Sequence, residues 1–222
     1  MIEPYYDKVV DFALEFVCSA TEVRFLGISV FETNERNAYV GNYIAAQEVL
    51  WERIRKLVPR FDFELLIEVV REELALRFVG HYLGPLGVDM MVVRTPLKEG
   101  EGSRGSTHPL PALPPLSRTP HPPSGTSPNL GAETKELLVH PCVEVNVRRT
   151  MGELSLHMVP LLAEGAEGFF RIVYDKEAGG LQRAVAAMPP AVYDDNGKLV
   201  SGTMLLTPLT DDTHYVAVVE IR

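Results

Sequence analysis

Hydrophobic and polar positions alternate with a period of two over much of the chain, which is typical of half-buried β-strands. In residues 11–17, Phe12, Leu14 and Phe16 share one side of such a strand. A second strand is predicted at residues 22–31, and the intervening segment is short enough for a hairpin. Further strands are predicted at residues 87–95, 135–147, 168–175, 203–208 and 213–221.

Helical spacing of apolar residues replaces this alternation in four places. Residues 42–58 predict a helix with Asn42 as its N-cap, and residues 62–80 predict a second one, with Asp62 near its start and Gly80 at its end. Residues 150–165 look helical with a break near Pro160, and residues 176–188 predict a short helix. Because hairpins alternate with helices, we expect an α+β fold: a mostly antiparallel sheet with packed helices.

One segment breaks both patterns. Residues 96–135 are dominated by proline, serine, glycine and threonine, and such a composition buries too little apolar surface to offset its ordering entropy. We therefore expect a disordered insertion in an enlarged hairpin connection, with residues 1–95 and 136–222 forming a single folded unit. A proline-rich ligand for a partner domain is the alternative interpretation of the insertion.

Composition narrows the class of partner and the compartment. The formal net charge of the 222 residues is −9, which argues against a general nucleic-acid binder. No apolar run approaches transmembrane length and the N-terminus lacks the pattern of a signal peptide, so no membrane association is expected. Cys18 and Cys142 form no disulfide-type or CxxC pattern, and we expect both to be buried, reduced thiols of a cytoplasmic protein.

The strand at residues 141–149 places distinct chemistry on its two faces. By alternation, Val143, Val145 and Val147 share one face, which we expect to be core. Glu144, Asn146 and Arg148 share the other face. Carboxylate and amide oxygens are ligands that Mg²⁺ takes, and the guanidinium fork suits phosphate or carboxylate.

A second acidic residue, Asp89, lies on the strand predicted to pair with this one. Hairpin geometry would place Asp89 across the ladder from Glu144, and two opposed acids repel unless a cation lies between them. Asp89, Glu144 and Asn146 thus predict a magnesium site, with Arg148 beside it, of the kind used in nucleotide phosphoryl chemistry. A solvated polar strand face is the alternative.

Two short motifs on these strands resemble motifs of a known enzyme superfamily. The segment G-x-x-G-V-D at residues 84–89, followed by E-x-N-x-R at residues 144–148, resembles the C-terminal lobe of ATP-grasp enzymes. The resemblance implies that Asp89, Glu144 and Asn146 bind Mg²⁺ ions that bridge the phosphates of ATP. It also implies that Arg148 contacts phosphate and acts as a catalytic residue in forming an acyl-phosphate.

A second stretch, residues 25–45, resembles a segment of uncharacterised ATP-grasp proteins. Its hydroxyl and amide side chains are predicted to line a substrate pocket; the alternative is turn chemistry plus a helix N-cap. The predicted pocket residues are Ser29, Thr33, Asn34, Tyr39 and Asn42.

The resemblance covers one lobe of an ATP-grasp enzyme. It implies a truncated chain, completed by a separate N-terminal half that supplies the phosphate-gripping lysines, with Glu3 as a nucleotide-contacting hinge residue. Self-association into a homo-oligomer through uncovered apolar surface is also expected. The expected activity is ATP-dependent ligation of an unidentified carboxylate substrate to an amine. The alternative is a non-catalytic relic or interaction module with a vestigial nucleotide site. A magnesium-dependent phosphohydrolase would share the ligands but lacks an evident base.

Overall fold

The structure, a computed structural model, describes residues 6–94, 136–177 and 179–221. Its strands and helices, in chain order, are β1 (Asp7–Cys18), β2 (Val23–Thr33), β3 (Tyr39–Ile44), α1 (Gln47–Leu57), α2 (Phe63–Phe78), β4 (Gly84–Arg94), β5 (Leu137–Asn146), α3 (Met151–Met158), the short 3₁₀ helix η1 (Val159–Leu161), β6 (Gly168–Tyr174), α4 (Gly180–Ala186), β7 (Val192–Tyr193), β8 (Leu199–Ser201), β9 (Thr203–Leu205) and β10 (Tyr215–Ile221). The predicted insertion at residues 96–135 and the predicted hinge residue Glu3 lie outside the described residues.

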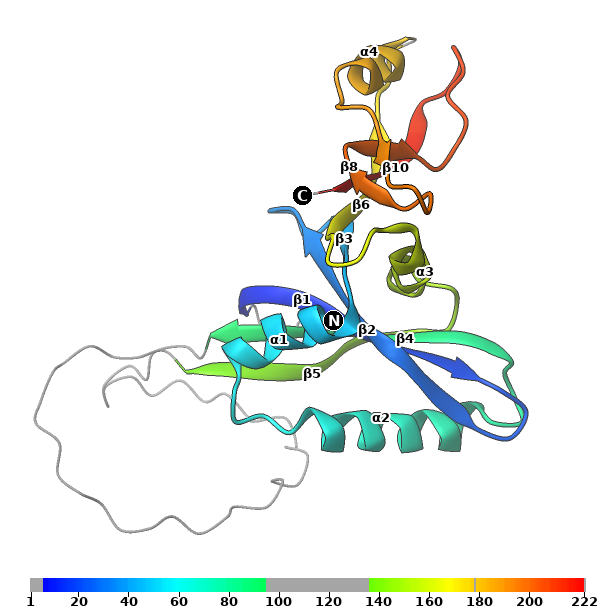
Figure 1. Ribbon diagram of the computed structural model, residues 1–222. Helices are drawn as coiled ribbons and strands as arrows, with labels where there is room; N and C mark the ends of the chain where they lie inside the picture. Colours follow the sequence, from blue (N-terminus) through cyan, green and yellow to red (C-terminus); the bar gives the residue numbers. More distant parts are fainter. Residues whose placement is uncertain (1–5, 95–135, 178, 222) are drawn as a thin grey trace, which may run out of the picture.

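The fold is α+β, as the sequence predicts. One antiparallel sheet has the strand order β5-β4-β1-β2-β3-β6-β10-β9, and β7 and β8 form a small second sheet (Figure 1). Segments on both sides of residues 95–135 therefore share one sheet, with β4 and β5 as neighbours.

The side chains of β1, an interior strand, alternate between the two faces of the sheet. Phe12, Leu14 and Phe16 are fully buried on one face, as the alternation predicts. There they join a core that also contains Leu50 of α1 and Leu66 of α2. By pleat alternation, Ala13 and Glu15 point to the opposite face.

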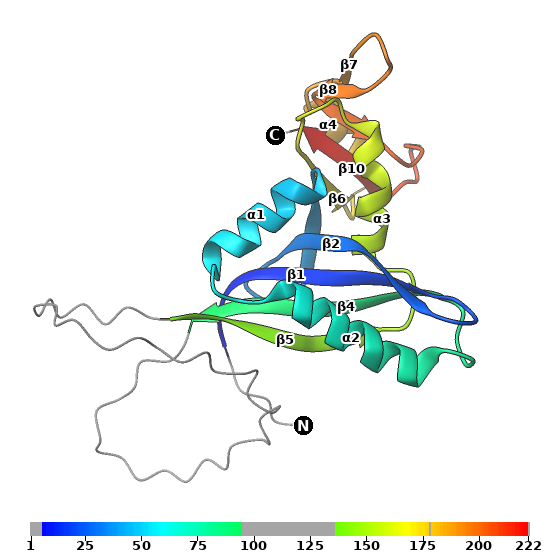
Figure 2. The same cartoon turned by 60° about the horizontal axis from the view of Figure 1, so that its bottom comes forward.

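Helices α1 and α2 cover the apolar face (Figure 2). The start of α2 agrees with the prediction, because the Asp62 side chain accepts a hydrogen bond of 2.9 Å from the Leu65 backbone N–H. Its end also agrees, because Val79 caps the helix and Gly80 follows with φ of 81°.

The predicted N-cap role of Asn42 is wrong. Residues 39–44 form strand β3, and α1 begins only at Gln47, with Ala46 as its N-cap. Asn42 pairs in the sheet with Phe31 on β2 and Phe170 on β6. Two neighbouring strands hydrogen-bond to this segment, and this tertiary pairing outweighs the local helical pattern.

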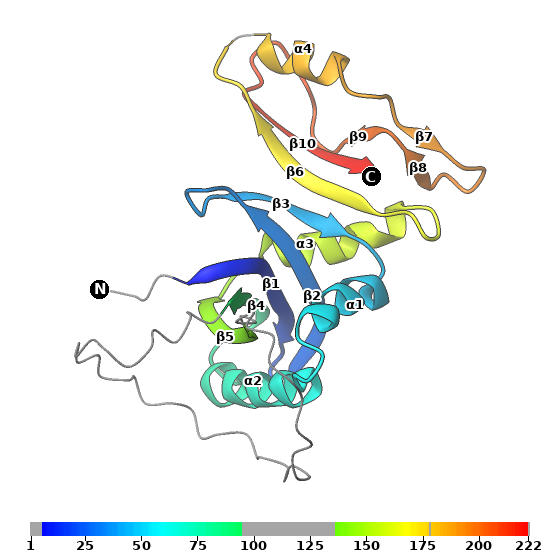
Figure 3. The ribbon, with the colours of Figure 1, turned by 90° about the vertical axis from the view of Figure 1, so that its left-hand side faces the viewer.

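Helix α3 lies on the face of the sheet opposite α1 and α2, where it contacts β1, β2, β3 and β4 (Figure 3). Thr150 caps it, because the hydroxyl oxygen accepts a 2.9 Å hydrogen bond from the Glu153 backbone N–H. The helix passes into η1 at Val159, close to the break predicted at Pro160. The first turn of α3 lies against Glu15 of β1 and Ser29 of β2.

The expected core face of β5 is exposed. Val143, Val145 and Val147 are 53%, 41% and 42% exposed, whereas Asn146 on the other face is buried. Strand β5 is the edge of the sheet, and the helical cover of the apolar face lies over β1 and β2. The β4–β5 register is irregular next to Val143, which lines the same outer cleft as Glu144. Which face of an edge strand is covered also depends on how far the helices extend.

The C-terminal strands extend the sheet beyond β3. Strand β6 pairs with β3 and β10, and β10 pairs with β9. Helix α4 buries Leu181 against Val216 and Val218 of β10. This is the smallest of three apolar clusters among the described residues; another contains Ile44, Phe170 and Val219.

Both cysteines are free thiols, but only Cys18 is buried; the expected burial of Cys142 is wrong, because it lies exposed on the edge strand. Among the described residues, no helix is both long and apolar enough to cross a bilayer.

Candidate functional site

The sheet register gathers the predicted residues on one face. Asp89 on β4 lies opposite Glu144 on β5 and Ala13 on β1, and Ala13 in turn lies opposite Ser29 on β2. Because directly opposed residues point to the same side of a sheet, these four side chains form a row across four strands. The predicted pairing of Asp89 with Glu144 is confirmed.

Asp89 is half-buried and is held by its neighbours. Asn146 Nδ2 donates a hydrogen bond of 3.1 Å to Asp89 Oδ2. Burial, and then the negative charge of Glu144, raise the pKa of Asp89 from 3.8 to about 6, although the Asn146 hydrogen bond and the positive charge of Arg148 lower it. The ionised form of Asp89 is therefore disfavoured, and a cation bound beside it would favour that form.

Arg148 follows the end of β5 and is exposed. In the described part of the chain its guanidinium makes one hydrogen bond, from Nη1 to the Arg149 carbonyl, at 3.3 Å. It is close enough to Asp89 to lower the pKa of that carboxyl. Its fork of donors is thus available to an anion beside the carboxylate pair.

Glu15, which is not among the site residues predicted from the sequence, is a buried carboxyl group of the inner cleft. It is 1% exposed, and its two oxygens accept hydrogen bonds from Ser29 Oγ at 2.9 Å and Thr150 Oγ1 at 2.8 Å. Burial is the main cause that raises the pKa of Glu15 from 4.5 to about 7; the two hydrogen bonds lower it, and the charges of Asp89 and Glu153 raise it slightly. The signal was present in the sequence, because Glu15 is the one charged residue in the otherwise apolar residues 12–18.

Gly152 allows α3 to approach this carboxylate. A Cβ atom at position 152 would lie 1.9 Å from Glu15 Oε1 and 2.3 Å from Ser29 Oγ. Gly87 on β4 leaves similar room, since its Cβ would lie 2.6 Å from Thr150 Cγ2. The start of α3 is therefore fixed to β1, β2 and β4 by close packing as well as by hydrogen bonds.

On β3, Tyr39 and Asn42 form a pair beside this cluster. The Tyr39 hydroxyl donates to Asn42 Oδ1, and burial raises the pKa of Tyr39 well above its ordinary value, so this hydroxyl stays protonated. Asn42 is buried, and its Nδ2 has no hydrogen-bond partner among the described residues.

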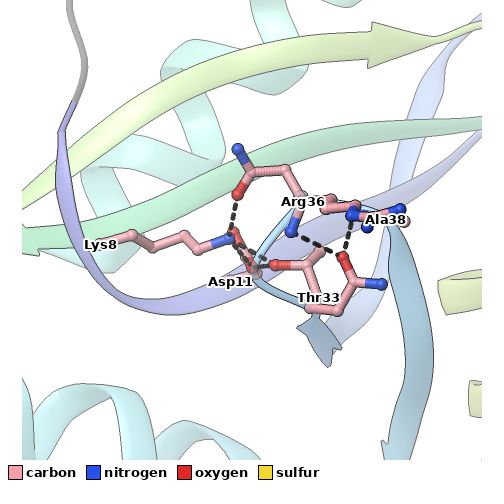
Figure 4. Close-up of polar contacts among 7 residues, drawn as sticks. Lys8, Asp11, Thr33, Arg36 and Ala38 are labelled. Carbon is pink, nitrogen blue, oxygen red and sulfur yellow. Dashed lines mark hydrogen bonds and ion pairs between the residues drawn. The ribbon is translucent and has the colours of Figure 1, made fainter.

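A second polar cluster lies at the other end of this face (Figure 4). Lys8 Nζ is 2.7 Å from Asp11 Oδ2, and the Thr33 hydroxyl donates to the same oxygen at 2.9 Å. Asn34 has a turn role: its Oδ1 accepts hydrogen bonds from the Arg36 and Ala38 backbone N–H groups at 2.9 and 3.0 Å.

Two adjoining clefts open on this face. The inner cleft, of about 370 Å³, and the outer cleft, of about 920 Å³, share Phe31, Thr33, Asn37, Asp89 and Glu144. The carboxylate pair thus lies where the clefts meet. The inner cleft is also lined by Ala13, Glu15, Ser29, Tyr39, Asn42, Asn146, Arg148, Thr150, Met151 and Gly152, and the outer cleft by Tyr6, Asp7, Lys8, Asp11, Asn34, Glu35, Met90, Met91, Arg94 and Val143.

The predicted site residues that the structure describes therefore all line one connected cleft. Asn34 lines only its outer part. In the described ranges, no group of three or more histidine, cysteine, aspartate and glutamate side chains is arranged to hold a metal ion. A cation at the junction would rely on two carboxylates, Asp89 and Glu144, and the amide oxygen of Asn146.

Comparisons with known proteins give a fold likeness only. No protein-family model matches the sequence, and no curated protein matches it significantly. Among solved structures, the chain is similar to an ATP-grasp enzyme, N5-carboxyaminoimidazole synthetase from Staphylococcus aureus, which was crystallised with ADP. The TM-score is 0.44 and the identity 9%, over 99% of this chain and 48% of that one. The present chain thus spans about half the length of that enzyme.

Proposed function

We propose that this chain is the magnesium- and ATP-binding lobe of an ATP-grasp-type ligase. The observation that carries the proposal is the register of β4 and β5, which sets Asp89 directly opposite Glu144 at the junction of two clefts. Opposed carboxylates destabilise a strand pair. A cation that binds between Asp89 and Glu144 would offset this repulsion and account for the presence of both carboxylates where the clefts meet.

The donor set suits magnesium. Mg²⁺ binds a small number of carboxylates and completes its shell with water and substrate phosphates, so two carboxylates and one amide oxygen suffice. Asp89, Glu144 and Asn146 would hold the ion. When bound, Mg²⁺ would offset the negative charge of the phosphates and polarise the phosphoryl group that is transferred.

The chain's own residues then have separate roles. The Arg148 guanidinium binds phosphoryl oxygens and stabilises the charge that develops during transfer. The buried Glu15–Thr150 hydrogen bond holds the start of α3, and hence the turn that carries Arg148, against the sheet. In the proposed reaction the substrate carboxylate attacks the γ-phosphorus and ADP leaves. An amine then attacks the acyl-phosphate and inorganic phosphate leaves.

Removing one carboxylate of the pair tests the proposal. We expect Asp89→Asn and Glu144→Gln each to weaken the binding of Mg²⁺–ATP by at least about tenfold in isothermal titration, because each removes a charge from the ion's ligands. The thermal midpoint of ligand-free Asp89→Asn should not fall, because the change removes repulsion between Asp89 and Glu144.

Asp195→Asn, at an exposed turn, is the matched control and should bind as the original protein does. Binding of ATP that is equally strong without Mg²⁺, or that survives both carboxylate changes, would remove the metal from this position and with it the proposed function.

A further inference from the structure

The hydroxyl groups of the inner cleft are already engaged by the protein. Ser29 and Thr150 both donate to Glu15, and the Tyr39 hydroxyl donates to Asn42. The Thr33 hydroxyl donates to Asp11. Glu15 accepts at both of its oxygens, so it has little capacity left for a ligand.

One donor on the β3 side of the cleft is different. Asn42 is only 1% exposed, and within the described chain its Nδ2 meets no acceptor. Its Oδ1 is held by Tyr39, which fixes the orientation of the amide. Buried polar groups in native proteins are nearly always paired. Asn42 is one of the residues that line the inner cleft, so an acceptor that enters this cleft would account for its unpaired amide N–H.

We propose that the inner cleft binds a second small ligand, and that the Asn42 side-chain amide donates a hydrogen bond to a carbonyl or carboxylate oxygen of that ligand. Asp89 and Glu144 border both clefts, so this ligand would lie next to the proposed Mg²⁺–ATP site. In this respect the inference rests on the proposed function. A volume of about 370 Å³ is at the small end of ligand pockets and suits a metabolite of modest size.

Asn42 then acts as a specificity-determining residue. A ligand with an oxygen acceptor satisfies the Nδ2 group, whereas a ligand that offers only N–H donors leaves two donors facing each other. Tyr39 is a positioning residue, since its hydroxyl holds the amide with Nδ2 available.

The test follows the Asn42 side-chain amide signals of the ¹⁵N-labelled full chain by NMR. The probes are acetamide and acetate, which offer acceptor oxygens, and methylammonium, which offers only donors. We expect saturable shifts of the Asn42 NH₂ signals with acetamide, acetate or both, and none with methylammonium. Absence of a saturable shift with either acceptor probe, or an equal shift with methylammonium, would overturn the inference.

Variants separate recognition from folding and from the nucleotide site. Asn42→Asp removes the donor and should weaken probe binding at least tenfold, with Asn196→Asp at an exposed turn as the matched control. If Asn42→Asp does not fold, Tyr39→Phe serves instead and should weaken binding through loss of amide orientation; unchanged affinity in the folded variant contradicts the inference. The probes are titrated without Mg²⁺ or ATP, whereas the proposed function is tested by Mg²⁺–ATP binding, so failure of the proposed function and failure of this inference give different results.

Discussion

Gly152→Ala is expected to destabilise the fold by about 3 kcal/mol or more, because the added methyl group overpacks a buried site and breaks the hydrogen bonds of Glu15 there. The new Cβ would lie 1.9 Å from Glu15 Oε1 and 2.3 Å from Ser29 Oγ. The helix propensity of alanine would favour α3 by about 1 kcal/mol, which is too little to offset this overlap. Denaturant unfolding of the variant and the original protein measures the difference.

Two companion variants identify the cause. Gly168→Ala is the matched control and should be milder, because the nearest atoms to a Cβ there are 3.3 Å away. Adding Glu15→Ala to Gly152→Ala removes the atom in closest conflict, so the double variant should be less destabilised than the sum of the single changes. Strict additivity, or an alanine at 152 that is tolerated, would mean that α3 does not pack as described.

Glu15 should make stability depend on pH. The pKa of Glu15 is about 7 in the folded chain against 4.5 ordinarily, so the folded protein holds this proton more tightly than the unfolded chain does. The resulting stability is fully present below pH 4.5 and is lost as the pH rises through 7. The shift corresponds to about 3 kcal/mol.

Comparison with Glu15→Gln isolates this contribution, since Asp89 and other groups titrate in both proteins. From pH 4.5 to 8, the free energy of unfolding of the original protein should fall by about 3 kcal/mol more than that of Glu15→Gln. Glu164→Gln, at an exposed site, should follow the original protein. Parallel profiles for the original protein and Glu15→Gln would show that Glu15 is not buried as a proton-holding carboxyl.

Local sequence patterns were sufficient for seven of the strands, although not for β3, β7 or β8, and for the opposition of Asp89 and Glu144. That opposition follows from a hairpin pairing and from pleat alternation, both of which are local rules. The same rules could not determine how far the helical cover extends: Val143, Val145 and Val147 are exposed on the edge strand β5 or directly after it.

Asn42 and Glu15 show the second limit. The residues around Asn42 carry a helical pattern, but pairing with β2 and β6 makes them a strand, and pairing across the chain is not visible in a short window. Glu15 meets Thr150 across 135 positions in the sequence, so its role depends on the placement of α3. The sequence marks it only as an acid among Phe12, Leu14 and Phe16.

The most direct test of the central claim is to locate the metal. Mn²⁺ in place of Mg²⁺, added with ATP at a small fraction of the protein concentration, broadens NMR signals steeply with proximity to the ion. We expect the backbone signals of Asp89, Glu144 and Asn146 to broaden first and those of β10 to persist. Asp89→Asn should remove this pattern. Broadening centred elsewhere in the chain, or none in the presence of ATP, would contradict a metal–nucleotide site on this pair of strands.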